Sequence, residues 1–205
     1  EAAAVREHYL GALEAIKTRA LPTQLSVKLT HLGLDAGRDA CVSDVGRLAA
    51  HAATVGSFVW IDMEESHYVD ATLGIFREIR ASHANVGLCL QAYLHRTPAD
   101  MERLLPLGGH IRLCKGAYVE EPEVAVNSKS AVDTAYATQL RTLMADEEVR
   151  PAVATHDLEL VDLARELARD REQPFEFQML YGVRSGLQRQ LVAEGFAMRV
   201  YLPFG

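Results

Sequence analysis

The chain has 205 residues, of which 49% are hydrophobic and 24% charged, a composition typical of one globular domain with a sizeable core. Its formal net charge of -7 argues against nucleic-acid binding, which needs an excess of Lys and Arg on one surface. The sequence contains no signal peptide and no apolar run long enough to span a bilayer, so we expect a cytoplasmic protein without stable membrane insertion.

Helices and strands alternate in the first half of the chain. Apolar residues at Val5, Leu10 and Leu13, with charges between them, predict an amphipathic helix over residues 1–20, ended by Pro22. The segments that follow are predicted in this order: a strand over 25–30, a helix over 43–55 closed by Gly56, a strand over 58–61, a helix over 66–80 and a strand over 86–90.

The second half continues the alternation. Thr97 reads as a helix cap followed by Pro98 and by Asp100, and the short helix that it opens ends at Gly108. Ser130 with Asp133 predicts another capping box and a helix to about residue 145. The remaining predicted segments are strands over 111–114, 151–154, 175–179 and 197–202, and helices over 158–168 and 184–194.

This alternation of apolar strands with helices predicts an α/β fold with a parallel sheet covered by helices. A doubly wound open sheet and a (β/α)8 TIM-type barrel both fit. The sequence has no GxGxxG after its first strand, and polar residues follow nearly every strand, which favours a distorted barrel. Because the sequence starts on a helix and ends on a strand, we expect a single barrel domain over 1–205 whose first strand and last helix are missing.

A set of mostly polar residues stands where the predicted strands end. Gln91 and Gln178 lie inside or beside apolar strands, and a buried amide must find hydrogen-bond partners. Because the carboxyl ends of parallel strands meet at one face of a barrel, the set indicates a polar ligand there. Its members are Lys28, Asp62, Glu64, Gln91, Tyr93, Arg112, Lys115, Tyr118, Thr155, His156, Gln178, Leu180 and Tyr201.

Several chemistries are excluded by this set. The eight histidines are scattered, only His156 stands at a strand end, and Cys41, Cys89 and Cys114 have no CxxC spacing, so we expect neither a metal site nor a disulfide framework. The nucleophile elbow GxSxG is absent. Two possibilities remain open: Schiff-base chemistry on Lys28 or Lys115, and redox chemistry with a bound flavin, which needs cations, amides and a close-approach glycine.

Seven segments in this order resemble the proline dehydrogenase family: VKLTHLGLD, WIDMEES, LCLQAYLHR, IRLCKGAY, VATHD, FEFQMLYGVR and RVYLPFG. The resemblance covers essentially the whole chain and is stronger to the short monofunctional bacterial type than to the large bifunctional protein. It implies a distorted (β/α)8 barrel that uses FAD to oxidise L-proline to Δ1-pyrroline-5-carboxylate, the first step of proline catabolism, and passes the electrons to a membrane quinone.

The resemblance also implies roles for individual residues. Asp62 and Arg112 match the two catalytic positions, and Arg112 would also contact the flavin near N5. The residues matching the proline pocket are Lys28, which binds the carboxylate, and the pocket walls Tyr118, Leu180 and Tyr201. The residues expected to contact FAD are Met63, Gln91, Lys115, Gly116, Ala117, Thr155, His156 and Gln178.

The sequence departs from the family at its ends. The family's final helix carries an arginine pair that clamps the proline carboxylate, and the sequence stops before it; bidentate recognition would then be lost. The alternatives are therefore a lysine-dependent barrel lyase or aldolase, and a catalytically impaired flavin-binding barrel fragment. The resemblance further implies location at the inner membrane surface and a downstream pyrroline-5-carboxylate dehydrogenase as a partner.

Overall fold

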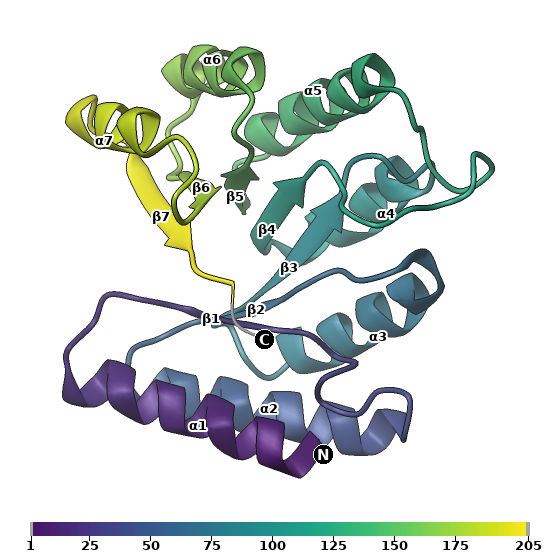
Figure 1. Cartoon of the computed structure of the whole chain (residues 1–205), viewed down its shortest axis with the longest axis vertical. Coiled ribbons are helices and arrows are strands. Elements are labelled where there is room, and N and C mark those ends of the chain that lie inside the picture. Colours follow the sequence, from purple (N-terminus) through teal and green to yellow (C-terminus); the bar gives the residue numbers. More distant parts are fainter. Residues whose placement is uncertain (1, 204–205) are drawn as a thin grey trace. The chain divides into compact units, whose positions relative to one another are not determined.

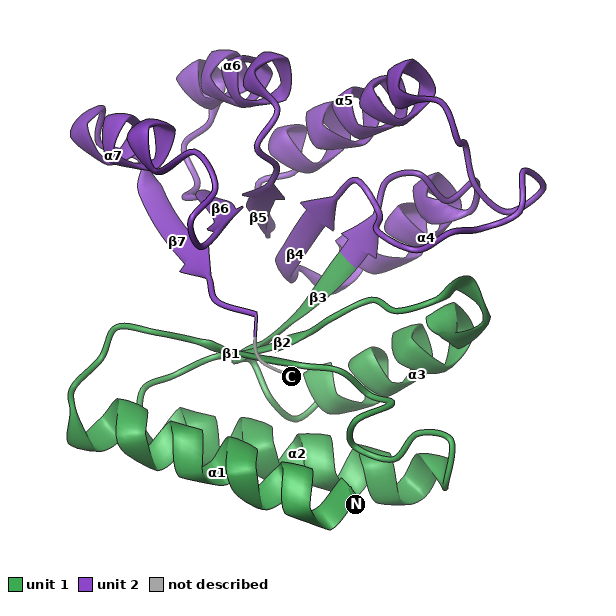
Figure 2. Ribbon diagram, in the orientation of Figure 1, with its two compact units in different colours: residues 1–89 green, residues 90–205 purple. Residues whose placement is uncertain are grey.

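The structure is a computed structural model that describes residues 2–203 (Figure 1). Phe204 and Gly205, the end of the RVYLPFG segment, lie outside the described residues. The chain divides into two compact units, residues 1–89 and 90–205 (Figure 2). No helix within residues 2–203 is long and apolar enough to span a membrane.

The first unit alternates helices with parallel strands. Leu25 pairs with Val59 and Val59 with Val86, so strands β1, β2 and β3 lie in chain order. The elements are α1 (Ala2–Thr18), β1 (Leu25–Val27), α2 (Arg38–Thr54), β2 (Val59–Ile61), η1 (Ser66–Tyr68), α3 (Val69–Arg80) and β3 (Val86–Gln91), whose last two residues belong to the second unit.

Two predicted boundaries in the first unit are wrong. Helix α2 begins at Arg38, five residues before the predicted Ser43. Its first turn is mostly polar, so the sequence pattern does not show it, but Cys41 in that turn is completely buried and packs the turn onto the core. Strand β1 ends at Val27 and not at Thr30, because the chain turns there and Leu32 donates its backbone N–H to the Lys28 carbonyl oxygen.

The second unit continues the pattern with four more parallel strands in chain order. Figure 1 shows α5, α6 and α7 following one another along one side of β4 to β7. The elements are α4 (Thr97–Leu104), η2 (Leu105–Leu107), β4 (Gly109–Cys114), α5 (Lys129–Ala145), β5 (Val149–Ala154), α6 (Leu158–Leu167), η3 (Ala168–Asp170), β6 (Glu176–Leu180), α7 (Ser185–Ala193) and β7 (Ala197–Tyr201).

The register divides the sheet of the second unit into two faces of different chemistry. Leu113 pairs with Val153 and Val153 with Phe177, and all three side chains are completely buried. One residue earlier, Arg112 pairs with Ala152, which pairs with Glu176. Because side chains alternate between the faces of a sheet, one face is apolar and the other carries the polar groups.

Both predicted capping boxes are wrong. Thr97 is the first residue of α4, and its hydroxyl donates to the Gln91 carbonyl oxygen at 2.6 Å. Helix α5 is capped by Ser128, whose hydroxyl accepts from the Ala131 N–H at 3.2 Å. Asp133, expected to close the second box, pairs with two lysines instead. A capping pattern indicates the region where a helix starts. A side chain in that pattern does not cap the helix when the folded structure offers it a stronger hydrogen-bond or ion-pair partner.

The predicted alternation is confirmed: the described residues form seven parallel strands with helices between them. Closure into an eight-stranded barrel, the single domain over 1–205 and the missing first strand and last helix stay predictions.

Gly87 offers a test of the packing in the first unit. A Cβ added there would lie 2.7 Å from a ring carbon of Trp60, which is almost fully buried beside it. We expect Gly87→Ala to lower the free energy of unfolding by roughly 1 to 3 kcal/mol, the usual cost of overpacking. Gly11→Ala is the matched control: Gly11 has open space around its Cβ position in α1, so the helix should gain about 0.5 to 1 kcal/mol. Urea unfolding measures both, and equal stability of the two variants would contradict the clash.

Candidate functional site

Two of the predicted site residues follow neighbouring strands of the first unit. Val27 and Ile61 end β1 and β2 in register, and the next residues are Lys28 and Asp62. The Asp62 N–H donates to the Val27 carbonyl oxygen at 2.9 Å, so the two loops leave the sheet together. The predicted site residue Met63 follows and is buried. The register thus confirms that Lys28 and Asp62 stand at adjacent strand ends.

Glu64 holds the turn that follows Lys28. Its buried carboxylate accepts hydrogen bonds from the Thr30 N–H at 3.0 Å and the Thr30 hydroxyl at 2.5 Å. A carboxylate that accepts two hydrogen bonds is held in one geometry. Glu64 therefore supports the loop that carries Lys28.

Tyr9 is a neighbour of Lys28 that the sequence analysis did not single out. Burial raises the pKa of its hydroxyl, a hydrogen bond with the Lys28 backbone opposes this shift, and the charges of Asp62 and Glu64 add to it. Its hydroxyl therefore lies among the groups that surround Lys28. Tyr9 stands in the apolar stripe of α1, and a tyrosine in such a stripe carries no sequence signal that separates a site residue from a core residue.

In the second unit, Arg112 and Gln178 meet on the polar face of the sheet. The Arg112 Nε donates to Gln178 Oε1 at 2.6 Å, and the guanidinium lies 5.5 Å from the centre of the Tyr201 ring. Arg112 is 5% exposed and Gln178 4%. The fold therefore removes the Arg112 guanidinium from water.

The ends of β5 and β6 are joined by a histidine. His156 Nε2 accepts the Leu180 N–H at 2.8 Å, which requires an unprotonated ring nitrogen. Burial lowers the pKa of His156, and the charge of Arg184 lowers it further. The preceding Thr155 is buried, and its hydroxyl accepts the Asp157 N–H at 3.1 Å. A neutral His156 thus brings the loops of Thr155 and Leu180 together.

Gly116 has a backbone and a neighbour that only glycine tolerates. Its φ is 119°, and a Cβ there would overlap the Tyr93 ring. The Tyr93 N–H donates to the Lys115 carbonyl oxygen at 2.9 Å, which holds the two loops together. Gln91, 2% exposed, precedes this contact by two residues, and the half-buried Tyr118 follows it. The glycine therefore lets its loop pack directly against the Tyr93 ring.

Lys115 belongs to a cluster of four charges. Its ammonium donates to Asp133 and, at 2.9 Å, to Asp157 Oδ2. Lys129 donates to the same two carboxylates at 2.5 and 3.3 Å. The Lys115 hydrogen bond is the main reason why the pKa of Asp157 falls to about 2, and the pKa of Asp133 is lowered by the same two lysines. The sequence analysis assigned Asp133 to a cap and left Asp157 unassigned.

The structure brings together part of the predicted set within each unit. Lys28 and Asp62 neighbour each other in the first unit, and Arg112, Gln178 and Tyr201 do so in the second. The Lys115 side chain points to two aspartates, so its predicted contact with a cofactor stays a prediction. The exposed Ala117 has no contact that tests its predicted role.

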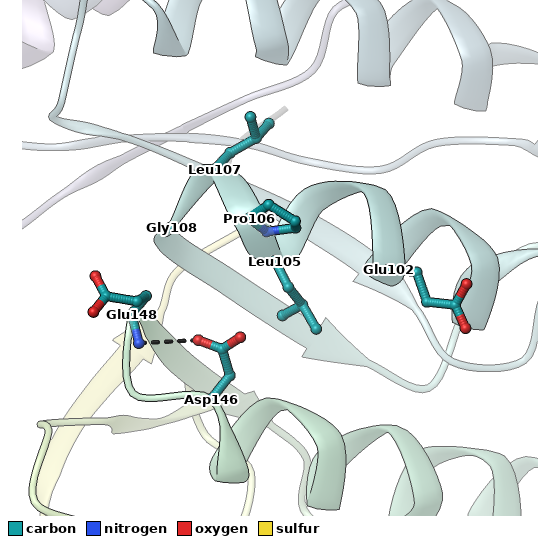
Figure 3. A pocket seen from close by; sticks show the side chains of 7 residues that line it. All are labelled: Glu102, Leu105, Pro106, Leu107, Gly108, Asp146 and Glu148. Carbon is teal, nitrogen blue, oxygen red and sulfur yellow. Dashed lines mark hydrogen bonds between the residues drawn. The ribbon is translucent and has the colours of Figure 1, made fainter.

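The hollow drawn in Figure 3 is a different place. It has a volume of about 500 Å³ and is lined by Leu105, Gly108, Asp146 and others that precede β4 and β5, whereas the predicted site residues follow the strands. Asp146 there accepts the Glu148 N–H at 2.9 Å, an ordinary turn contact. Within residues 2–203 no group of three or more His, Cys, Asp or Glu side chains could hold a metal ion.

Comparison with known proteins gives one family. The proline dehydrogenase family model matches residues 1–205. The chain is 39% identical over 202 residues to proline dehydrogenase 2 of Bacillus subtilis, a match that covers 97% of this chain and 66% of that protein. It is 39% identical over 207 residues to proline dehydrogenase of Deinococcus radiodurans, covering 94% of this chain and 64% of that protein. The chain thus spans a little under two thirds of these relatives.

The fold has matches among solved structures. A crystal structure of proline utilization A from Bradyrhizobium japonicum superposes with a TM-score of 0.90 at 26% identity. The match covers 100% of this chain and 25% of that chain. The α/β fold of this chain therefore resembles the fold of a region that makes up a quarter of that larger protein.

The four-charge cluster makes a stability prediction. Asp157 caps α6 by accepting the Glu159 N–H, and asparagine can cap equally well, so Asp157→Asn removes only the charge. Because the side chain is partly exposed, we expect the free energy of unfolding at neutral pH to fall by roughly 1 to 2 kcal/mol. A depressed pKa stabilises the fold above the ordinary value of 3.8, and this contribution is lost as the pH falls through about 2.

The difference in stability between the two proteins should therefore shrink in acid. Asp162→Asn is the control, since Asp162 pairs with Arg165 at an exposed site and should change the unfolding free energy by less than about 0.5 kcal/mol. Urea unfolding at several pH values measures the differences. A difference that persisted unchanged down to pH 2 would contradict a contribution from the Asp157 charge, and no difference at neutral pH would leave Asp157 as a cap only.

Proposed function

Because this chain belongs to the proline dehydrogenase family, we propose that it is the FAD-binding core of an enzyme that oxidises L-proline to Δ1-pyrroline-5-carboxylate. The family match over residues 1–205 and two relatives of that name at 39% identity support the proposal.

The observation that carries the proposal is the buried cation on the polar face of the second unit. Arg112 is 5% exposed in a strand whose neighbours Ile111 and Leu113 are apolar, and it contacts a neutral amide and an aromatic ring. Burying a guanidinium is costly, so a fold that does so holds a positive charge at a fixed place. A positive charge that the fold holds beforehand stabilises negative charge that develops in a reaction, without reorganisation at that moment.

The residues of the second unit fit FAD. The flavin ring edge requires amide groups, and Gln91 and Gln178 are buried amides near strand ends. Gly116 is a further proposed contact, and its loop packs against the Tyr93 ring with a backbone that only glycine tolerates. The FAD contacts proposed besides these are Met63, Arg112, Ala117, Thr155, His156 and the backbone of Lys115, whose side chain organises the loop through Asp133 and Asp157.

Bound FAD would accept a hydride, which is two electrons with one proton. The hydride would leave the ring CH2 carbon that is bonded to the proline nitrogen, not the carbon that bears the carboxylate, and the nitrogen would lose a proton. In the proposed site Lys28 binds the proline carboxylate, and Asp62 orients the lysine and the substrate. Tyr118, Leu180 and Tyr201 exclude water from the ring. Arg112 holds its charge against the flavin ring, where the reaction places negative charge.

The proposal extends to the partners of the whole protein. The two electrons would go on to a membrane quinone, so we infer transient contact of the full-length enzyme with the inner membrane surface. The product would pass to a pyrroline-5-carboxylate dehydrogenase. The barrel would be closed by the family's remaining strand and helix.

The alternative is a lysine-dependent lyase that uses Lys28 or Lys115. One observation argues against Lys115 as the nucleophile. A Schiff-base lysine needs a lowered pKa, so that the amine is free to attack. Burial acts to lower the pKa of Lys115, but hydrogen bonds to Asp133 and Asp157 outweigh burial, and the pKa is raised. Lys28 is then the remaining candidate for such a nucleophile.

A spectrum of the purified full-length protein separates the two functions. We expect the visible absorption of oxidised flavin and its bleaching when L-proline is added without oxygen. A colourless protein that borohydride links covalently to a carbonyl substrate, with the link lost in Lys28→Met, would instead establish the lyase.

Arg112→Met tests the mechanism. Methionine fills a similar volume without a charge, so the fold should persist. We expect the midpoint potential of the bound flavin to fall by about 30 to 60 mV, since a hydrogen bond to a charged group contributes roughly 1.5 to 3 kcal/mol and 30 mV corresponds to about 1.4 kcal/mol for two electrons. Reduction by proline should slow in parallel.

Spectroelectrochemical titration measures this potential. Arg165→Met is the control, because Arg165 pairs with Asp162 and Glu194 on the helical side of the second unit. An unchanged potential in a folded, flavin-loaded Arg112→Met protein would leave Arg112 with a structural role only.

A further inference from the structure

We propose that Glu176, held by Arg199, positions Arg112 by fixing which end of the Gln178 amide faces the guanidinium. The proposal rests on the proposed function for what Arg112 does in the reaction. Glu176 and Arg199 then act on the site through Gln178, as positioning residues.

The contacts form one continuous chain. Arg112 Nε donates to Gln178 Oε1 at 2.6 Å, and Gln178 Nε2 donates to Glu176 Oε1 at 2.5 Å. Arg199 closes the chain through Nε to Glu176 Oε1 at 3.0 Å and Nη2 to Glu176 Oε2 at 3.0 Å. The two-pronged contact of Arg199 leaves the Glu176 carboxylate little freedom to rotate.

The chemistry of the outer members sets the direction of every hydrogen bond. Arginine can only donate, so the Gln178 oxygen must face Arg112. A carboxylate accepts, so the Gln178 amino group must face Glu176. If the amide turned over, two donors would meet at Arg112 and two acceptors at Glu176. Glu176 therefore locks the amide in the one orientation that binds Arg112.

The fold leaves room for this chain to cross the sheet. Arg112 lies on β4 and Gln178 on β6, so their side chains must reach over β5. At the facing positions β5 carries alanines: Ala152 is in register with Arg112, and Ala154 with Gln178. Since residues in register share a face of the sheet, the small side chains keep the path clear.

Burial makes the lock effective. Gln178 is 4% exposed, so water does not readily replace a lost partner, and an unsatisfied buried amide is costly. Without Glu176 the Gln178 amide loses one of the two groups that fix its orientation, and the acceptor of the Arg112 Nε–H is held less tightly. An ion pair that only braced β6 against β7 would not transmit this effect to Arg112.

The first measurement does not depend on activity. In 15N NMR spectra of the purified full-length protein, the Arg112 Nε–H signal is identified by its loss in Arg112→Met. In Glu176→Leu we expect this N–H to exchange with solvent at least roughly tenfold faster, because its acceptor is no longer held. Glu176→Gln keeps an acceptor oxygen and should restore most of the protection.

The second measurement uses the flavin. We expect Glu176→Leu to shift the midpoint potential in the same direction as Arg112→Met but by less. In the double variant it should add nothing to the Arg112→Met shift, because both changes act through one guanidinium. Glu194→Gln, which weakens the Arg165 ion pair outside this chain of contacts, is the matched control and should change neither measurement.

The outcomes separate the two proposals. An unchanged Arg112 N–H signal and potential in Glu176→Leu, or fully additive shifts in the double variant, overturn the positioning role.

If Glu176→Leu fails to fold, Arg199→Met is the decisive variant, because it keeps the Glu176 carboxylate but frees it to rotate. Faster Arg112 N–H exchange in Arg199→Met supports the proposal, and unchanged exchange overturns it. A protein without flavin would refute the proposed function, while the exchange measurement would still test the positioning.

Discussion

The requirement that organises the second unit is the burial of a permanently charged guanidinium in a parallel sheet. Arg112 is removed from water, so the strands around it must supply compensation on the same face. Gln178 supplies a hydrogen bond, Tyr201 an aromatic ring, and the small residues Ala152 and Ala154 the space between them. The other face of the same strands remains purely apolar. A sheet that only supported helices would have no reason to keep this asymmetry.

The loops at the strand ends are held by a second kind of interaction, polar contacts that span distant parts of the sequence. Glu64 fixes the turn after Lys28 by accepting two hydrogen bonds from Thr30. Lys115 draws the starts of two helices toward its own loop through their aspartates. These contacts keep the functional groups in place before any ligand arrives, which is the arrangement that electrostatic stabilisation of a reaction requires.

The predictions from the sequence succeeded where local pattern and long-range packing agree. The apolar run ending at Ile61 is a strand end, as predicted, because continuous apolar residues have only the sheet interior to occupy. The predictions failed where a side chain had a choice of partners. Thr97 and Asp133 both fit a capping pattern, yet each binds a group outside its own helix: the Gln91 carbonyl oxygen and the Lys115 ammonium. Local propensity could not weigh those partners, since they come close only after folding.

The sequence by itself determined the alternation of helices and strands, the polar positions at the strand ends and the family. It does so because hydrophobic periodicity and residue type are local properties, and because motifs such as Lys115-Gly116-Ala117 are readable without coordinates. Only the tertiary structure decided which groups meet. The pairing of Arg112 with Gln178 across an intervening strand, the link from Glu176 to Arg199 and the place of Tyr9 beside Lys28 depend on register and helix packing. Those depend on the fold as a whole, so no local segment encodes them.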